Sequence, residues 1–155
     1  MTEEKNPPFR YLNRDDIAVI HRVLSDQARA GGEPIPPLSH AKEGDIDSLI
    51  MAPQQALGGR DLYPSLEEKA AFLFYSINKR QIFLNGNKRM STLCLLVFLG
   101  INGKLLQLKP DELTAKALWL ANTPSLDFPA IKMELATWIR ERLVDLPDLP
   151  ADLAA

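Results

Sequence analysis

Residues 65–101 read SLEEKAAFLFYSINKRQIFLNGNKRMSTLCLLVFLGI, and this stretch decides the fold. It lies within the longest run of the chain without proline, so two long helices are expected here. Ser65, followed three residues later by Glu68, is a capping box that marks the start of the first helix. The residues that follow are apolar nearly all round, which is typical of a helix buried on most sides. The second helix, over 87–101, is equally apolar, and we expect it to be central too.

Helices are also predicted on both sides of this pair. Asn13 is a candidate N-cap, with two aspartates in the first turn behind it. The predicted helices outside the pair cover 14–30, 45–52 and 128–146, and one begins with Pro110 as its first residue. Only residues 105–108 indicate extended structure. We therefore predict a single all-α domain over 1–155, a helical bundle with flexible tails at 1–9 and 147–155.

The composition excludes several classes of protein. The 155 residues are 46% hydrophobic and 25% charged, which suits one globular domain and argues against disorder. No apolar run is long enough to span a membrane, and the first eight residues contain no apolar segment of a signal peptide, so we expect a cytoplasmic protein. One cysteine, Cys94, and two histidines, His21 and His40, argue against a disulfide framework and a Cys/His metal site.

Basic residues are concentrated in the middle of the chain. The whole chain has a formal net charge of −2, yet no Asp or Glu occurs between Lys69 and Pro110. The basic residues of this segment are Lys69, Lys79, Arg80, Lys88, Arg89, Lys104 and Lys109. Such segregation indicates an anionic ligand for this segment, and the alternative is a solvated basic face on an otherwise acidic protein.

The turn between the two central helices is the candidate functional segment. Asn85, Gly86 and Asn87 form a turn signal and a helix start, because Asn caps helices well and Gly permits close approach of the backbone. Lys88 and Arg89 then fall in the first helical turn, where the helix dipole repels cations by a few tenths of a kcal/mol. Free N–H groups, a positive dipole end and two cations together describe an anion site. The alternative is a capped helix with two solvated basic side chains.

These residues resemble a known family. The segments 63–71, 83–89 and 98–103 are similar to the death-on-curing (Doc) branch of the Fic/Doc, or Fido, family, as are 43–50 and 52–54. The resemblance implies an all-helical Fido-type bundle in which the central helix pair is joined by the active-site loop. Family members transfer a phosphate or nucleotidyl group from ATP or another nucleotide, with Mg²⁺, to a hydroxyl of a protein substrate. Doc members are typically toxins whose antitoxin protein occupies the nucleotide groove.

The family motif assigns roles to the loop residues. Phe83 matches the apolar anchor of the loop, and Gly86 matches the small residue that lets the backbone approach the phosphates. Asn87, Lys88 and Arg89 match the phosphate-binding positions of the Doc version. Asn85 stands where many members have an acid that helps to hold Mg²⁺. Because a neutral amide is a weaker Mg²⁺ ligand, Mg²⁺ binding here would depend more on the phosphates of the nucleotide.

Gln81 stands where the family has its catalytic histidine. The histidine accepts a proton from the target hydroxyl, a task worth roughly 10²–10⁴-fold in rate, and a glutamine amide has no proton-accepting site near neutral pH. We therefore expect a toxin-like transferase that is inactive or severely slowed in the family reaction. Gln81 can be a native residue or an engineered change, and the sequence does not separate the two.

Two other functions stay open. A non-catalytic Fido pseudoenzyme would bind a nucleotide or a protein partner and regulate by occupancy. An enzyme that needs no base is a further alternative, because positioning and charge stabilisation dominate phosphoryl transfer. No nucleic-acid or membrane partner is expected. His21, Trp119 and Trp138 fall on apolar helix faces, so we expect them in the core rather than as a base or ligand platforms.

Overall fold

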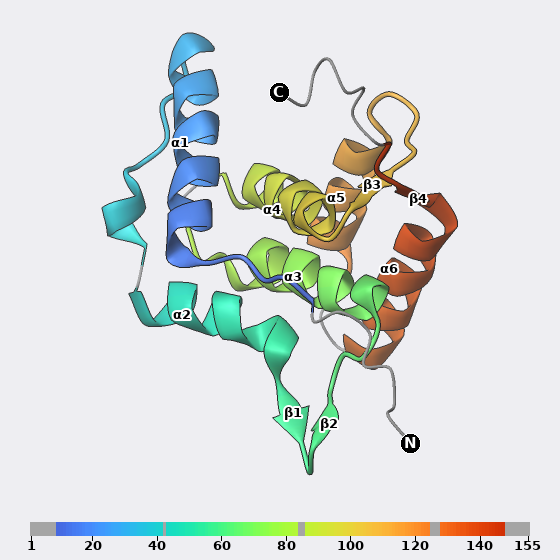
Figure 1. The fold of residues 1–155 in the computed structure, drawn as a ribbon. Coiled ribbons are helices and arrows are strands. Elements are labelled where there is room, and N and C mark those ends of the chain that lie inside the picture. Colours follow the sequence, from blue (N-terminus) through green and yellow to red (C-terminus); the bar gives the residue numbers. More distant parts are fainter. Residues whose placement is uncertain (1–8, 42, 84–85, 125–127, 148–155) are drawn as a thin grey trace, which may run out of the picture.

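The computed structural model describes residues 9–41, 43–83, 86–124 and 128–147, and helices dominate this part of the chain (Figure 1). The helices are α1 (Arg14–Ala30), α2 (Glu43–Met51), α3 (Leu66–Arg80), α4 (Asn87–Ile101), α5 (Glu112–Asn122) and α6 (Phe128–Arg142). Short 3₁₀ helices cover Leu38–His40 and Ala52–Gln54. The strands are β1 (Ala56–Leu57), β2 (Arg60–Asp61), β3 (Lys104–Leu106) and β4 (Leu143–Asp145). The predicted all-α class is confirmed.

Helices α3 and α4 form the centre of the molecule. They pack against each other, with α1 and α2 on one side and α5 and α6 on the other (Figure 1). The buried residues of α3 point in all directions, as its sequence predicted: Leu66, Lys69, Ala70, Ala71, Leu73, Phe74, Ser76, Ile77 and Asn78. Helix α4 is buried less completely than predicted, because Leu96 is 40% exposed and Leu93 and Val97 are only half-buried.

The helix starts that the sequence predicted from caps are found in place. At α1, the side chain of Asn13 accepts the N–H of Asp16, whose carboxylate accepts the N–H of Asn13. At α3, Ser65 and Glu68 make the same reciprocal pair. Both boxes satisfy amides that the first helical turn leaves without a partner, which is why local sequence was sufficient to place these ends.

Two predicted helix ends are wrong. Helix α5 begins at Glu112 rather than Pro110, because Asp111 has a φ of 62°, a left-handed conformation that cannot continue a helix. Helix α6 ends at Arg142 rather than residue 146, because residues 143–145 pair as β4 with β3. The extended segment expected at 105–108 is therefore β3, at 104–106, and its partner strand was not predicted.

A small hairpin was also missed by the sequence analysis, which expected only a loop there. Strands β1 and β2 pair antiparallel around Gly58 and Gly59, and the hairpin projects from the rest of the molecule (Figure 1). Both glycines have positive φ, 59° and 79°, as tight hairpin turns require. Asp61 ties the hairpin to α3, since its carboxylate lies 3.3 Å from the Nζ of the buried Lys69.

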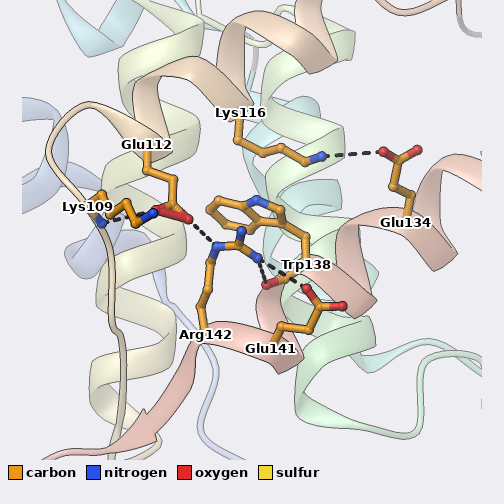
Figure 2. Close-up of polar contacts among 7 residues, drawn as sticks. All are labelled: Lys109, Glu112, Lys116, Glu134, Trp138, Glu141 and Arg142. Carbon is orange, nitrogen blue, oxygen red and sulfur yellow. Dashed lines mark hydrogen bonds and ion pairs between the residues drawn. The ribbon is translucent and has the colours of Figure 1, made fainter.

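Charged side chains and Trp138 join α5 and α6 (Figure 2). Arg142 at the end of α6 pairs with Glu112 at the start of α5, and its guanidinium stacks 4.4 Å from the centroid of the Trp138 ring. Lys116 lies 3.8 Å from the Trp119 centroid and pairs with Glu134. Both tryptophans are half-buried, so they border the core, as the apolar helix faces suggested, and serve as platforms for the protein's own cations.

The expected tails, 1–9 and 147–155, lie outside the described residues except for Phe9 and Pro147. Phe9 packs against the core, with its ring 5.1 Å from the Nζ of Lys69. Cys94 is fully buried in α4, as predicted for a small apolar residue, and burial raises its pKa to about 12. None of the described helices combines the length and apolar character needed to cross a lipid bilayer.

Candidate active site

The loop between α3 and α4 begins and ends with residues in the left-handed region of backbone space. Gln81, directly after α3, has a φ of 49° and a ψ of 51°, and Gly86, directly before α4, has a φ of 79°. A glutamine in this conformation costs roughly 1–2 kcal/mol, which glycine avoids. Backbone of this kind persists where neighbouring contacts over-determine it, so the contacts of the loop decide its shape.

Ile82 and Phe83 attach the first half of the loop to the core. Their side chains are 5% and 2% exposed. The Phe83 ring lies 5.9 Å, centroid to centroid, from the ring of His21 on α1. His21 is buried, as predicted, and this burial lowers the pKa of its imidazole. Phe83 therefore lies where an apolar anchor of the loop has to lie.

The side chain of Asn87 closes the loop on itself. Its Oδ1 accepts the N–H of Phe83 at 3.0 Å, and its Nδ2 donates to the carbonyl of Phe83 at 2.7 Å. Both polar ends of the amide are thus engaged with the loop backbone. The sequence analysis placed Asn87 in the turn at the helix start and among the phosphate-binding positions and missed this clamp, although the four-residue spacing from Phe83 is a signal for it.

Gly86 lies against α1 and the segment that follows it. A Cβ at this position would stand 3.3 Å from Cδ2 of Leu24 and 3.8 Å from Cγ2 of Ile35. Helix α4 starts directly afterwards, and the N–H of Met90 bonds to the carbonyl of Gly86 at 2.8 Å. The three amides that precede Met90 have no acceptor within the helix, because the first turn of every helix leaves its N–H groups without one.

Lys88 and Arg89 are exposed in this first turn. Within the described residues, neither side chain has a hydrogen-bond or ion-pair partner. Four of the other five basic side chains of the middle segment lie beside acceptors of the protein itself. The partners are Asp61 for Lys69, the carbonyls of Ala121 and Thr123 for Lys79, Asp45 for Arg80 and Asp145 for Lys104. For Lys109, the hydrogen bond to Glu112 is made by the backbone N–H.

This arrangement can bind an anion. Two cations with no counter-charge among the described residues stand at the positive end of the α4 dipole, beside amides that have no helical acceptor. Arg89 can grip a phosphate through two parallel hydrogen bonds, and Lys88 adds a point charge. Asn85, the expected Mg²⁺ position, lies outside the described residues. Among the residues that the structure does describe, no three His, Cys, Asp or Glu side chains gather in a group that could hold a metal ion.

The chain is similar in sequence to known proteins. The sequence profile of the Fic/DOC family matches residues 11–99, which run from the segment before α1 through most of α4 and include the whole loop. The chain belongs to the Fic/DOC family. A curated relative of this Fic/DOC chain, Toxin Doc of Mycolicibacterium smegmatis (strain ATCC 700084 / mc(2)155), is 33% identical over 129 residues. The aligned part covers 81% of this chain and 91% of that relative.

The Fic/DOC fold brings most of the predicted site residues together. Gln81, Phe83, Gly86, Asn87, Lys88 and Arg89 all lie between the last turn of α3 and the first turn of α4. The sequence analysis missed the support that the loop receives from outside its own segment. His21, Leu24 and Ile35 contact it from α1 and the following connection, and no local pattern in the sequence joins these positions to residues 83–86.

Proposed function

We propose that this protein is the toxin of a toxin–antitoxin pair, of the Doc type, and that its loop holds the phosphates of ATP or another nucleotide. One observation carries the proposal: Lys88 and Arg89 lack partners among the described residues, although Lys69, Lys79, Arg80 and Lys104 of the same segment have them. Membership of the Fic/DOC family and the 33% identical Toxin Doc support it. We expect the protein to act in the cytoplasm, together with an antitoxin protein.

The residues of the loop suit a nucleotide with its Mg²⁺. The first-turn amides of α4 and the side chains of Lys88 and Arg89 match the oxygens and charge of a polyphosphate. The sequence has no carboxylate between Lys69 and Pro110, so this segment offers Mg²⁺ an amide oxygen such as that of Asn85 but no charged ligand, and phosphate oxygens would supply the charged ligands. The nucleotide, when bound, supplies the phosphoryl or nucleotidyl group for transfer to a protein hydroxyl.

Gln81 limits what this site can do with a bound nucleotide. Its amide can accept a hydrogen bond from a target hydroxyl, but it cannot remove the proton at neutral pH. The missing base is worth roughly 10²–10⁴-fold in rate. We propose that the chain binds its nucleotide normally and is inactive or severely slowed in the transfer step.

The Gln81→His variant tests this proposal. We expect both forms to bind ATP with Mg²⁺ equally in calorimetry, and only Gln81→His to transfer label from ATP to protein and to arrest growth when expressed. Gln81→Ala is the matched control, because it changes the same side chain without adding a base. An inert Gln81→His that still binds ATP would contradict the disarmed-toxin proposal. Transfer by the unaltered chain at the rate of Gln81→His would show instead that no base is needed.

The substitution at Gln81 also favours a second candidate function. A chain that keeps the anion site but lacks the base would be suited to bind a nucleotide or a protein partner and to regulate by occupancy. A neighbouring small gene that encodes an antitoxin would favour the toxin. ATP binding without such a neighbour, together with an inert Gln81→His, would favour the pseudoenzyme.

A further inference from the structure

His21 is a polar side chain on the otherwise apolar buried face of α1. It is only 5% exposed. Burial lowers its pKa, so the neutral ring is the form that the fold favours. The imidazole nitrogens are not among the buried side-chain atoms that lack a hydrogen-bond partner in the described part of the chain. What this histidine contributes beyond filling space therefore depends on the residues that its ring contacts.

The contacts of His21 lead directly to the anion site. Its ring packs on Phe83, the anchor in the first half of the loop. Leu24, three residues further along the same face of α1, lies against Gly86 at the end of the loop. One face of α1 thus supports the loop at both ends. The contact of Leu24 lies at Gly86, shortly before Lys88 and Arg89.

Phe83 connects the His21 ring to Lys88 and Arg89. The backbone of Phe83 is held at both its N–H and its carbonyl by the side chain of Asn87, the first residue of α4. A shift of the Phe83 ring therefore moves the start of α4, which carries Lys88 and Arg89. Because phosphate contacts depend on placement to within about 1 Å, a small shift is enough to weaken them.

We propose that His21 is a positioning residue: through Phe83 and Asn87 it sets the place of Lys88 and Arg89, and so the affinity of the site for phosphate. The part of this inference that concerns affinity rests on the proposed nucleotide site. The part that concerns the loop does not, because its hydrogen bonds can be followed without any ligand.

The test compares His21→Ala and His21→Phe with Ile17→Ala. Ile17 lies on the same buried face of α1, but it lines a small apolar cavity with Tyr11 and Phe98, away from the loop. Because no residue of the loop lines that cavity, Ile17→Ala makes a hole on the same face of α1 on the side away from the loop. His21→Phe keeps a flat ring against Phe83. If that variant does not fold because its ring is too large, His21→Leu takes its place as the apolar variant that fills the site.

Hydrogen exchange of two amides is the readout that needs no ligand. In His21→Ala, the N–H of Phe83, bonded to Asn87, and the N–H of Met90, bonded to Gly86, should exchange at least about tenfold faster than global unfolding explains. Ile17→Ala should lower global stability without this local effect, and the ring of His21→Phe should restore protection. Unchanged local protection in His21→Ala, or the same loss in Ile17→Ala, would overturn the inference.

Calorimetry with ATP and Mg²⁺ supplies the second readout. We expect His21→Ala to bind about tenfold more weakly, which is about 1.4 kcal/mol, with Ile17→Ala unchanged and His21→Phe close to the unaltered protein. Unaltered affinity in His21→Ala would overturn the role of His21. Failure of the unaltered chain to bind ATP would instead contradict the proposed nucleotide site, and the exchange experiment would still decide whether His21 positions the loop.

Discussion

At the scale of the single residue, two separate features require a glycine at position 86. Its φ of 79° disfavours any residue with a Cβ, and Leu24 leaves only 3.3 Å for such an atom. The turn at Gly32 has the same φ of 79°, but a Cβ there would meet nothing within 4 Å. A comparison of Gly32 and Gly86 therefore separates the cost of backbone strain from the cost of a steric clash.

Alanine substitutions at these two glycines should differ in effect. We expect Gly32→Ala to lower the free energy of unfolding by about 1 kcal/mol through backbone strain alone. Gly86→Ala should lower it by about 2–3 kcal/mol, because Leu24 or the loop must also shift. Urea denaturation of both variants measures the difference. Equal losses would mean that the contact with Leu24 has no energetic importance.

At the scale of the element, Glu112 joins α5 to α6. Its carboxylate pairs with Arg142 and accepts the N–H of Lys109 at 3.0 Å, just before the helix starts (Figure 2). The hydrogen bond from Arg142 is the main cause that holds the pKa of Glu112 below its ordinary value of 4.5. Glu141 contacts the same Arg142 at 3.6 Å but is 65% exposed, which makes it a natural control.

The pKa of Glu112 gives a signed prediction for pH dependence. Because the pKa is lower in the folded state, the ionised carboxylate stabilises the fold above pH 4.5, and this contribution is lost as pH falls through the folded pKa. We expect Glu112→Gln to lower Tm at pH 7 and to lose this deficit as pH falls through the folded pKa of Glu112, below which the native carboxyl is protonated as well. Glu141→Gln should change Tm much less at either pH. A deficit for Glu112→Gln that persists unchanged at low pH would refute the assignment.

At the scale of the whole molecule, an anion at the loop is linked to global stability. A ligand that binds only the folded state stabilises it by about 2.7 kcal/mol at a hundredfold excess over Kd. The loop joins α3 and α4, the two helices that contact most of the others, so its occupancy should be felt in the cooperative unfolding of the protein.

Thermal unfolding with ATP and Mg²⁺ tests this linkage. For a chain of this length, saturating ligand should raise Tm by about 5–10 °C. Arg89→Ala should abolish most of the increase, because its guanidinium has no partner among the described residues and is free to bind the anion. Lys104→Ala should keep the increase, because Lys104 pairs with Asp145. An equal Tm increase in both variants would argue against an anion site at the start of α4.

Local signals were sufficient for the parts of the fold that obey local rules. The capping boxes at Asn13 and Ser65 and the apolar runs behind them placed α1 and α3 correctly. The end of α6 and the existence of β4 could not be predicted in this way, because Leu143 pairs with Leu106, far away along the chain. In the same way, the left-handed conformation of Asp111 arises in a turn whose neighbour, Glu112, is held by Arg142 of α6.

The sequence by itself determined the helical class and which chemical groups the loop carries. Helix caps, apolar periodicity and the short run from Gln81 to Arg89 all act within a few residues of each other, so they can be read in one dimension. Only the tertiary structure decided which cations remain without a counter-charge and what supports the loop. Arg80 and Arg89 look alike in the sequence, yet Asp45 of another helix pairs with the first and no described residue pairs with the second. Contacts such as those of His21 and Leu24 with the loop require distant segments to pack together, because charge pairing and burial depend on distance in space rather than along the chain.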